Sequence, residues 1–179
     1  CKKFLGLAGA MVPAGMKNII IDMINDGFFD VLVTTGANLT HDLVEGLGHS
    51  HYKGSEYADD AKLNKQGIVR IYDVYMKQKV YEDLEKFFNA NFDVFAKCKN
   101  IREFLSEVGR LAPEGTLINT CYEKKVPVFS PAISDSGIGL MIWNNIANGK
   151  TTNVNTFDDL KEILDIVWTS KKTGFLYLG

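Results

Sequence analysis

The residues best suited to chemistry follow a short apolar run near the start of the chain. Val31 to Val33 are too few for a helix and are bounded by turns, so they predict a strand buried on both faces. Thr34 to Asn38 then supply hydroxyls, an amide and unobstructed backbone N–H groups, and a helix can run from Leu39 to Leu47. Open α/β sheets bind nucleotides at such turns, because the helix dipole and free N–H groups favour anions. This turn therefore predicts a nucleotide site.

Two further polar loops that carry glycines follow predicted strands, at Gly6 to Gly15 and at Ser130 to Gly139. Connections in parallel sheets are right-handed, so the three loops should emerge at one edge of the sheet and converge on one ligand. The Gly6-Leu-Ala-Gly9 stretch is not a complete Gly-x-Gly-x-x-Gly fingerprint, and any one loop is also consistent with an ordinary turn. Three such loops together favour a binding site.

Asp135 is the acidic residue of interest in the third loop. Its carboxylate could accept hydrogen bonds from a ribose or pair with a cation. Its position also suits an N-cap for the segment Gly137 to Ile146, and the two roles do not exclude each other.

The three histidines are His41, His49 and His51. No carboxylate or thiolate stands at zinc-site spacing from the His49-Ser-His51 pair, so the pattern does not favour a metal site. His41 begins a predicted helix beside the presumed crevice and is interpreted as a site histidine. The alternative is a surface histidine in a first helical turn.

No nucleophile is evident from the sequence. Cys1, Cys98 and Cys121 are odd in number and widely spaced, which indicates reduced thiols in a cytoplasmic protein, with Cys121 as a small buried residue. The paired lysines flank strands and are interpreted as solvated edges, not as amines of depressed pKa.

The remaining chain alternates strands and helices. Strands are predicted at Lys3–Leu7, Val31–Val33, Val126–Phe129 and Phe175–Leu178, with a short strand or arm over Ile68–Val74. Helices are predicted after Pro13 (Met16, Ile19, Ile20, Met23 and Ile24 facing the sheet), at Leu39–Leu47, Tyr81–Phe95, Ile101–Pro113, Gly115–Lys124 and Gly139–Ile146, and after a Thr156 N-cap with Leu160, Ile163, Leu164 and Val167 buried. Residues 46–64 are predicted to be irregular. The pattern indicates an α/β fold, a Rossmann-like and mainly parallel sheet with helices on both faces.

Composition limits the partners. The net charge of -2 gives no reason to expect nucleic acid or an anionic membrane, and no apolar run is long enough to span a bilayer. At 179 residues the chain fits a single domain, residues 1–179. Because it begins without Met and ends on a predicted strand, we expect it to be part of a longer chain.

Several segments together resemble the deoxyhypusine synthase family. They are Phe4-Leu-Gly6 with the turn to Gly15, Asp30-Val-Leu-Val-Thr-Thr-Gly36, Asp42-Leu43, Gly67-Ile68 with Arg70-Ile71, and Val126-Pro-Val-Phe-Ser-Pro-Ala132 with Asp135. The likeness covers essentially the whole chain. It corresponds to the middle of such an enzyme.

The resemblance implies an NAD-dependent transfer of the aminobutyl group of spermidine to a lysine of the hypusine-bearing translation factor, by a homotetramer with sites between subunits. By position it places the NAD contacts on Gly9, Ala10, Met11, Val12, Pro13, Thr35, Gly36, Ala37, His41 and Asp135. The substrate would lie at Thr40 and His41. The lysine nucleophile is expected beyond Gly179, so no catalytic residue is assigned within these residues.

The chain departs from the eukaryotic pattern at the polyamine site. Thr40-His41 stands where eukaryotic members carry two glutamates, and Leu140 stands where they carry an aspartate. A buried polyamine needs paired negative charge, so these departures weaken the argument for spermidine. Thr-Gly-Ala-Asn-Leu-Thr-His-Asp instead resembles the archaeal and bacterial deoxyhypusine-synthase-like branch. The alternatives are aminobutyl transfer to a small amine, as in homospermidine synthesis, and a non-catalytic NAD-binding paralogue.

Overall fold

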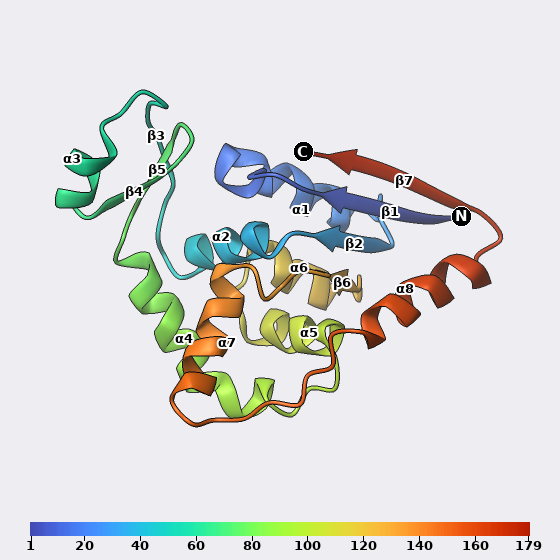
Figure 1. Ribbon diagram of the computed structural model, residues 1–179. Helices are drawn as coiled ribbons and strands as arrows, with labels where there is room; N and C mark the ends of the chain where they lie inside the picture. The colour runs from blue at the N-terminus through green and yellow to red at the C-terminus, as the bar shows by residue number, and fades with distance from the viewer.

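The computed structural model describes residues 1–179 and contains one central parallel sheet. Its four strands lie in the order β6-β2-β1-β7, all parallel. Their bounds are β1 Lys2–Leu7, β2 Val31–Thr34, β6 Val128–Phe129 and β7 Thr173–Leu178. Figure 1 shows these strands side by side. The predicted α/β class is confirmed.

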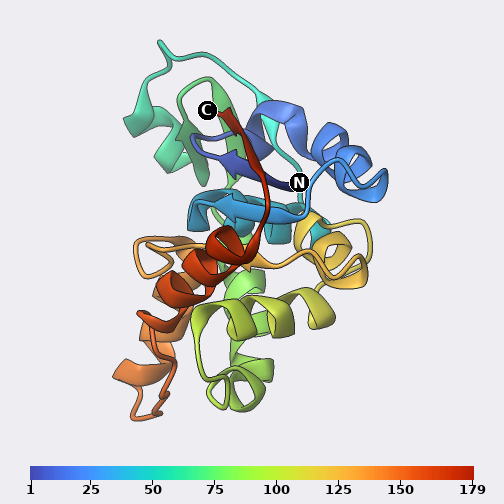
Figure 2. The same cartoon turned by 90° about the vertical axis from the view of Figure 1, so that its right-hand side faces the viewer.

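Eight α-helices and one short helical turn surround the strands. They are η1 (Val12–Met16), α1 (Lys17–Asn25), α2 (Gly36–Gly46), α3 (Asp60–Lys65), α4 (Val80–Phe95), α5 (Ile101–Leu111), α6 (Leu117–Glu123), α7 (Gly137–Ala147) and α8 (Asp158–Thr169). Figure 2 shows α8 on one side of the sheet and α1 with α6 on the other, as expected for a sheet covered on both faces. No helix has the length and apolar content needed to cross a membrane.

Side chains on the two faces of the sheet pack into two different hydrophobic clusters. Because successive side chains of a strand point to opposite faces, Phe4 and Leu5 lie on opposite sides of the sheet. Phe4, Val31 and Phe129 pack beneath Ile163, Ile166 and Val167 of α8. Leu5, Leu32 and Val128 belong to the main core of 24 buried residues, which also takes in the aromatic rings of α4 and α5. This core fixes the strands whose ends carry the predicted site.

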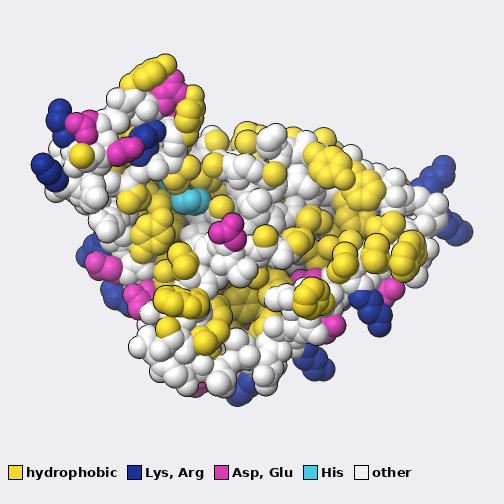
Figure 3. All heavy atoms as spheres, in the orientation of Figure 1, with side chains coloured by type: hydrophobic (Ala, Val, Ile, Leu, Met, Phe, Trp, Pro, Cys, Tyr) yellow, Lys and Arg dark blue, Asp and Glu magenta, His cyan; other side chains and the backbone are white.

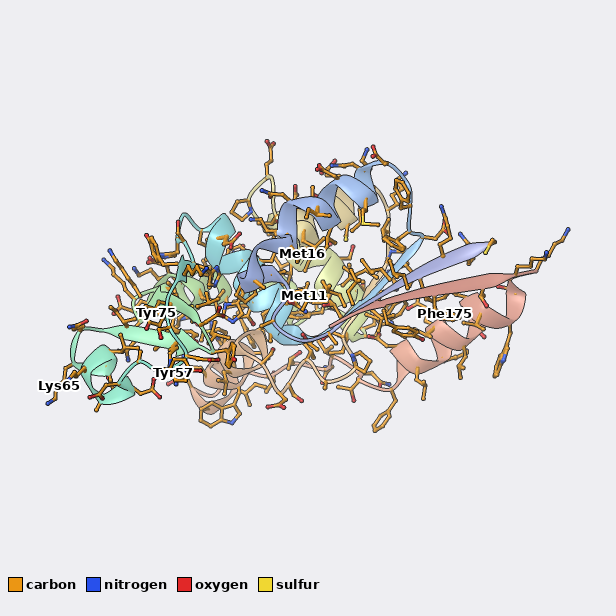
Figure 4. The ribbon with its side chains drawn as sticks, turned by 90° about the horizontal axis from the view of Figure 1, so that it is seen from above. Met11, Met16, Tyr57, Lys65, Tyr75 and Phe175 are labelled. Atoms are coloured by element: carbon orange, nitrogen blue, oxygen red, sulfur yellow. The ribbon has the colours of Figure 1, made fainter.

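A second, antiparallel sheet forms an arm outside the central sheet. It contains β3 (Tyr52–Lys53), β4 (Ile68–Ile71) and β5 (Val74–Lys77), ordered β3-β5-β4, with α3 beside them. Figure 1 shows the arm standing beyond the end of α2, and Figure 4 shows Tyr57, Lys65 and Tyr75 on it, at the opposite end of the molecule from Phe175 of β7.

Several local predictions were wrong. Residues 46–64 are not wholly irregular, since they contain β3 and part of α3. The short strand predicted within Ile68–Val74 is confirmed as β4, after which the chain turns at Tyr72, a residue with φ 53°, into β5. Regular hydrogen bonding in β6 begins only at Val128. Ile19 and Leu160 are exposed although helical spacing placed them on buried faces.

The prediction that Thr156 is the N-cap of α8 was also wrong. The N-cap is Phe157, whose N–H donates to Asn155 Oδ1, and no side chain caps the helix. An asparagine two residues upstream satisfies this N–H, so the threonine hydroxyl is not required for the turn.

Candidate functional site

The three predicted loops do meet at the carboxyl ends of β1, β2 and β6. Asn38 joins two of them: its Oδ1 accepts from the Val12 N–H at 3.1 Å, and its Nδ2 donates to the Leu7 carbonyl at 3.3 Å. Asn38 is fully buried. One side chain on α2 therefore holds the loop after β1 in place.

The loop after β2 is packed against the loop after β6. A Cβ placed on Gly36 would lie 2.5 Å from both Cβ and Oγ of Ser136, so only glycine permits this approach. On the neighbouring turn, the Thr40 hydroxyl donates to the Gly36 carbonyl and accepts from the Ile138 N–H. Gly137 in turn lies against the Thr40 methyl group. The N-termini of α2 and α7 are thus fixed side by side.

The N-terminus of α2 fits an anionic group. Thr35 is its N-cap, and its Oγ1 accepts from the Asn38 N–H at 3.4 Å. The Gly36 and Ala37 N–H groups precede the first intrahelical hydrogen bond and have no acceptor within the helix. Ala37 is exposed. These N–H groups and the dipole of an 11-residue helix are the features that bind the pyrophosphate of a dinucleotide.

The hydroxyl of Ser130 gives a second sign of a polar ligand at this edge. Ser130 follows directly after β6 and is buried, yet its Oγ has no hydrogen-bond partner in the protein. Buried hydroxyls are nearly always paired. An unpaired one at the carboxyl edge is consistent with a polar group that arrives with a ligand.

The loop after β1 presents mainly backbone to solvent. Gly9 has φ 59° and is exposed, Ala10 and Met11 are half-buried, and Val12 and Pro13 are buried. Met11 lies over this loop near the start of α1 (Figure 4). Contacts from Val12 and Pro13 would therefore be limited to their carbonyl groups, since the Val12 N–H is already bonded to Asn38.

The end of β7 reaches the same edge, which the sequence analysis did not anticipate. The Ala8 N–H donates to the Leu178 carbonyl at 2.8 Å, and a Cβ on Gly9 would lie 3.7 Å from the Gly179 Cα. Four strand ends, not three, therefore meet at this edge.

Asp135 is exposed in the third loop, and its carboxylate has no protein partner. The alternative reading of Asp135 as the N-cap of α7 is wrong. Ser136 is the N-cap: its Oγ accepts from the Gly139 N–H at 3.2 Å and donates to the Ile133 carbonyl at 2.6 Å. The Asp135 carboxylate is free for a ligand.

Two of the histidines contact each other. His41 Nδ1 lies 3.0 Å from His51 Nε2, and His51 Nδ1 lies 2.8 Å from Glu45 Oε1. Burial, followed by the neighbouring His51, lowers the pKa of His41 to about 4. His49 instead pairs with Asp83 at 3.0 Å. No group of three or more His, Cys, Asp or Glu side chains is arranged to hold a metal.

Thr40 and Asp42 serve the packing around the site. Thr40 is 4% exposed with its hydroxyl engaged on both sides, so a direct substrate role for its side chain stays a prediction. Asp42 is fully buried, and its oxygens accept from the N–H groups of Leu117 and Ile118 at 2.7 and 2.9 Å. This carboxylate therefore joins α2 to the N-terminus of α6.

The cysteines supply no nucleophile at the crevice. All three are free thiols, and Cys98 and Cys121 are buried. Burial raises the pKa of Cys98 to about 11 and raises that of Cys121 further. Cys121 is confirmed as a small buried residue.

The sequence analysis missed Asn38 as the residue that joins two loops, Ser136 as the cap, and the His51–Glu45 pair. A buried asparagine two residues after a glycine turn was the one available signal. His51 lies ten residues from His41, and nothing in the spacing predicts that the chain folds back after α2.

A parallel sheet covered on both faces, with glycine-bearing loops and a helix N-terminus at its carboxyl edge, defines an open α/β protein, a class whose ligands generally bind at that edge. Residues 1–179 match the family described as Deoxyhypusine synthase. The chain belongs to this family.

Its relatives and a solved structure agree. The chain is 46% identical over 179 residues to "Probable deoxyhypusine synthase 1" of Methanosarcina mazei, covering 99% of this chain and 56% of the relative. It is 42% identical to "Probable deoxyhypusine synthase 2" of Archaeoglobus fulgidus over 98% of this chain and 59% of the relative. A crystal structure of a provisionally named deoxyhypusine synthase from Entamoeba histolytica superimposes with a TM-score of 0.76 at 19% identity, over 100% of this chain and 57% of that one, and shows the same fold. The chain thus spans little more than half the length of these proteins.

Proposed function

We propose that the full-length protein is an NAD-dependent aminobutyl transferase that forms deoxyhypusine. It would take the aminobutyl group of spermidine and attach it to one lysine of the hypusine-bearing translation factor. The supporting observation is the convergence of the loops after β1, β2 and β6 on the N-terminus of α2, in a chain 46% identical to a relative named for this activity.

The residues divide the binding of NAD among the loops. The Gly36 and Ala37 N–H groups would face the pyrophosphate, where the dipole of α2 favours negative charge. The loop from Gly9 to Pro13 would contribute backbone groups, and the free Asp135 carboxylate would accept from ribose hydroxyls. Bound NAD would supply the oxidation of the amine.

The rest of the assignment concerns parts of the full-length protein. We place the lysine that takes the aminobutyl group covalently beyond Gly179, in the portion of the relatives that this chain does not cover. We also propose a cytoplasmic homotetramer, with no nucleic-acid or membrane partner.

The test is a labelling reaction. Full-length protein is incubated with NAD, spermidine labelled in its aminobutyl portion and the translation factor precursor. The expected result is label on one lysine of the precursor, dependent on NAD. Failure of the precursor to gain label, with the protein shown to be folded, would reject the proposal.

One observation favours a second candidate, transfer to a small amine. The position of the family's polyamine aspartate is Leu140, which is 58% exposed, and the Thr40 hydroxyl is bonded within the protein. Neither supplies the negative charge that a desolvated polyamine needs. Product analysis with putrescine as acceptor separates the two activities. A protein that binds NAD but transfers nothing to either acceptor would be a non-catalytic paralogue.

A further inference from the structure

One stripe of α2 is less buried than the rest of the helix. Its residues 38–40 and 42–44 are buried, whereas Ala37 is exposed and His41 and Glu45 are half-buried. Residues four apart lie above one another on a helix. Ala37, His41 and Glu45 therefore form a stripe that starts at the candidate NAD site.

A chain of hydrogen bonds follows this stripe. Starting at His41, Nδ1 lies 3.0 Å from His51 Nε2, His51 Nδ1 lies 2.8 Å from Glu45 Oε1, and Lys17 Nζ lies 2.9 Å from Glu45 Oε2. The His51 side chain is only 4% exposed. His41 Nε2 makes no hydrogen bond in the protein, so it is the free end of the chain.

The charge of Glu45 determines which ring nitrogen of each histidine carries the proton. Although burial opposes ionisation, the hydrogen bonds from His51 and Lys17 outweigh it and hold the pKa of Glu45 below its ordinary value. An ionised carboxylate only accepts, so the proton between Glu45 and His51 sits on His51 Nδ1. With His51 neutral, its Nε2 accepts from His41 Nδ1–H. The Nε2 of His41 then carries a lone pair that no group of the protein uses.

We propose that His41 is the base that deprotonates the amine substrate and that His51 and Glu45 are positioning residues that receive its charge. This inference rests on the proposed function. A protonated secondary amine loses one proton to His41 Nε2, and the Nδ1 proton of His41 passes to His51 Nε2. The positive charge comes to rest on His51, beside ionised Glu45. The neutral amine would then be the form that bound NAD can oxidise.

This transfer of the proton from His41 to His51, here called the relay, explains how a poorly basic histidine can serve as a base. Burial and the neighbouring His51 lower the pKa of His41 to about 4, so near neutral pH its ring carries one proton and not two. In the relay it never holds two ring protons at rest. The other charged groups near the chain are Lys17, already paired with Glu45, and buried Asp42, which is bonded to the N-terminus of α6.

Ring-nitrogen NMR of full-length protein with ¹⁵N-labelled histidine tests the arrangement without any turnover. The expected spectrum at neutral pH shows His41 protonated at Nδ1 and bare at Nε2. A His41 ring protonated at Nε2 would overturn the proposal.

Kinetics test the role. His51→Gln and Glu45→Gln should slow NADH formation from NAD and spermidine by about tenfold to a hundredfold and shift the acid limb of its pH profile, with NAD affinity nearly unchanged. His49→Gln is the matched control, because His49 forms a similar pair with Asp83 outside the chain, and it should change neither. If the two relay variants alter only thermal stability or NAD affinity, the proposal is wrong.

The two proposals fail separately. If wild type and His49→Gln form no NADH from any amine, the proposed function fails. The ring-nitrogen spectra still decide whether the hydrogen-bonded chain has the stated polarity.

Discussion

Replacing Gly36 with alanine tests the contact that brings two crevice loops together. The new Cβ would meet both Cβ and Oγ of Ser136 at 2.5 Å and the Ile133 Cδ1 methyl at 3.2 Å. The methyl group of Ile133 can move by a few tenths of an ångström, but the Cβ of Ser136 is fixed to the backbone of the N-cap of α7. The loops must therefore separate. Overpacking of this kind costs about 1–3 kcal/mol.

The compensating variant makes the test specific. Ser136→Gly removes both clashing atoms, and because glycine is tolerated at an N-cap it should itself cost only about a few tenths of a kcal/mol. In that background Gly36→Ala should be close to neutral, since alanine is a better helix residue than glycine. Urea unfolding of the wild type, both single variants and the double variant gives the coupling energy.

We expect a coupling of about 1–3 kcal/mol between positions 36 and 136. Additive effects, or a Gly36→Ala variant as stable as the wild type, would show that the loops do not touch as described. Either result would also remove the basis for a shared binding site.

Three further predictions, which use four substitutions, concern other parts of the structure. Asn38→Leu leaves the Val12 N–H buried without an acceptor and should lower the free energy of unfolding by about 1–3 kcal/mol in urea; an unchanged value would refute the role of the amide. Burial raises the pKa of Asp42 from 3.8 to about 6, so its contribution to stability is complete below pH 3.8 and is lost as the pH rises through about 6. Between those limits the wild type should lose about 3 kcal/mol relative to Asp42→Asn, and parallel pH curves would contradict this. Phe88→Ala, within the aromatic core, should cost about 3–5 kcal/mol, whereas Phe157→Ala, at a position 82% exposed, should fall within about 0.5 kcal/mol of the wild type in the same assay.

The sheet and its loops could be predicted because they depend on local patterns. Apolar runs such as Val31 to Val33, followed by small polar turns, identify parallel strands and the edge at which their loops emerge. The long helix α4 was found by its period to within one residue at its start. These features need no knowledge of what lies far away in the chain.

The arm and the residues that join the loops could not be predicted in the same way. The arm is stabilised by pairing between β3, β5 and β4, and a two-residue strand such as Tyr52–Lys53 has no periodicity. The Gly36–Ser136 approach and the Asp42 bonds to α6 join segments 75 or more residues apart. Ile19 and Leu160 were predicted to be buried but are exposed, because helical spacing does not say which apolar residues other elements will cover.

Exposed apolar side chains also escape sequence reasoning. Figure 3 shows several patches of them on the face in view, and Trp143 of α7 and Trp168 of α8 are among the exposed large residues. Helical spacing alone does not distinguish such exposed residues from residues of the core.

We propose that the loops after β1, β2 and β6 form one NAD site at the carboxyl edge of the sheet. The most direct measurement is a crystal structure of the full-length protein with NAD. We expect the pyrophosphate at the N–H groups of Gly36 and Ala37, with a ribose near Asp135. NAD bound elsewhere, or no NAD at that edge in crystals of protein saturated with it, would contradict the account.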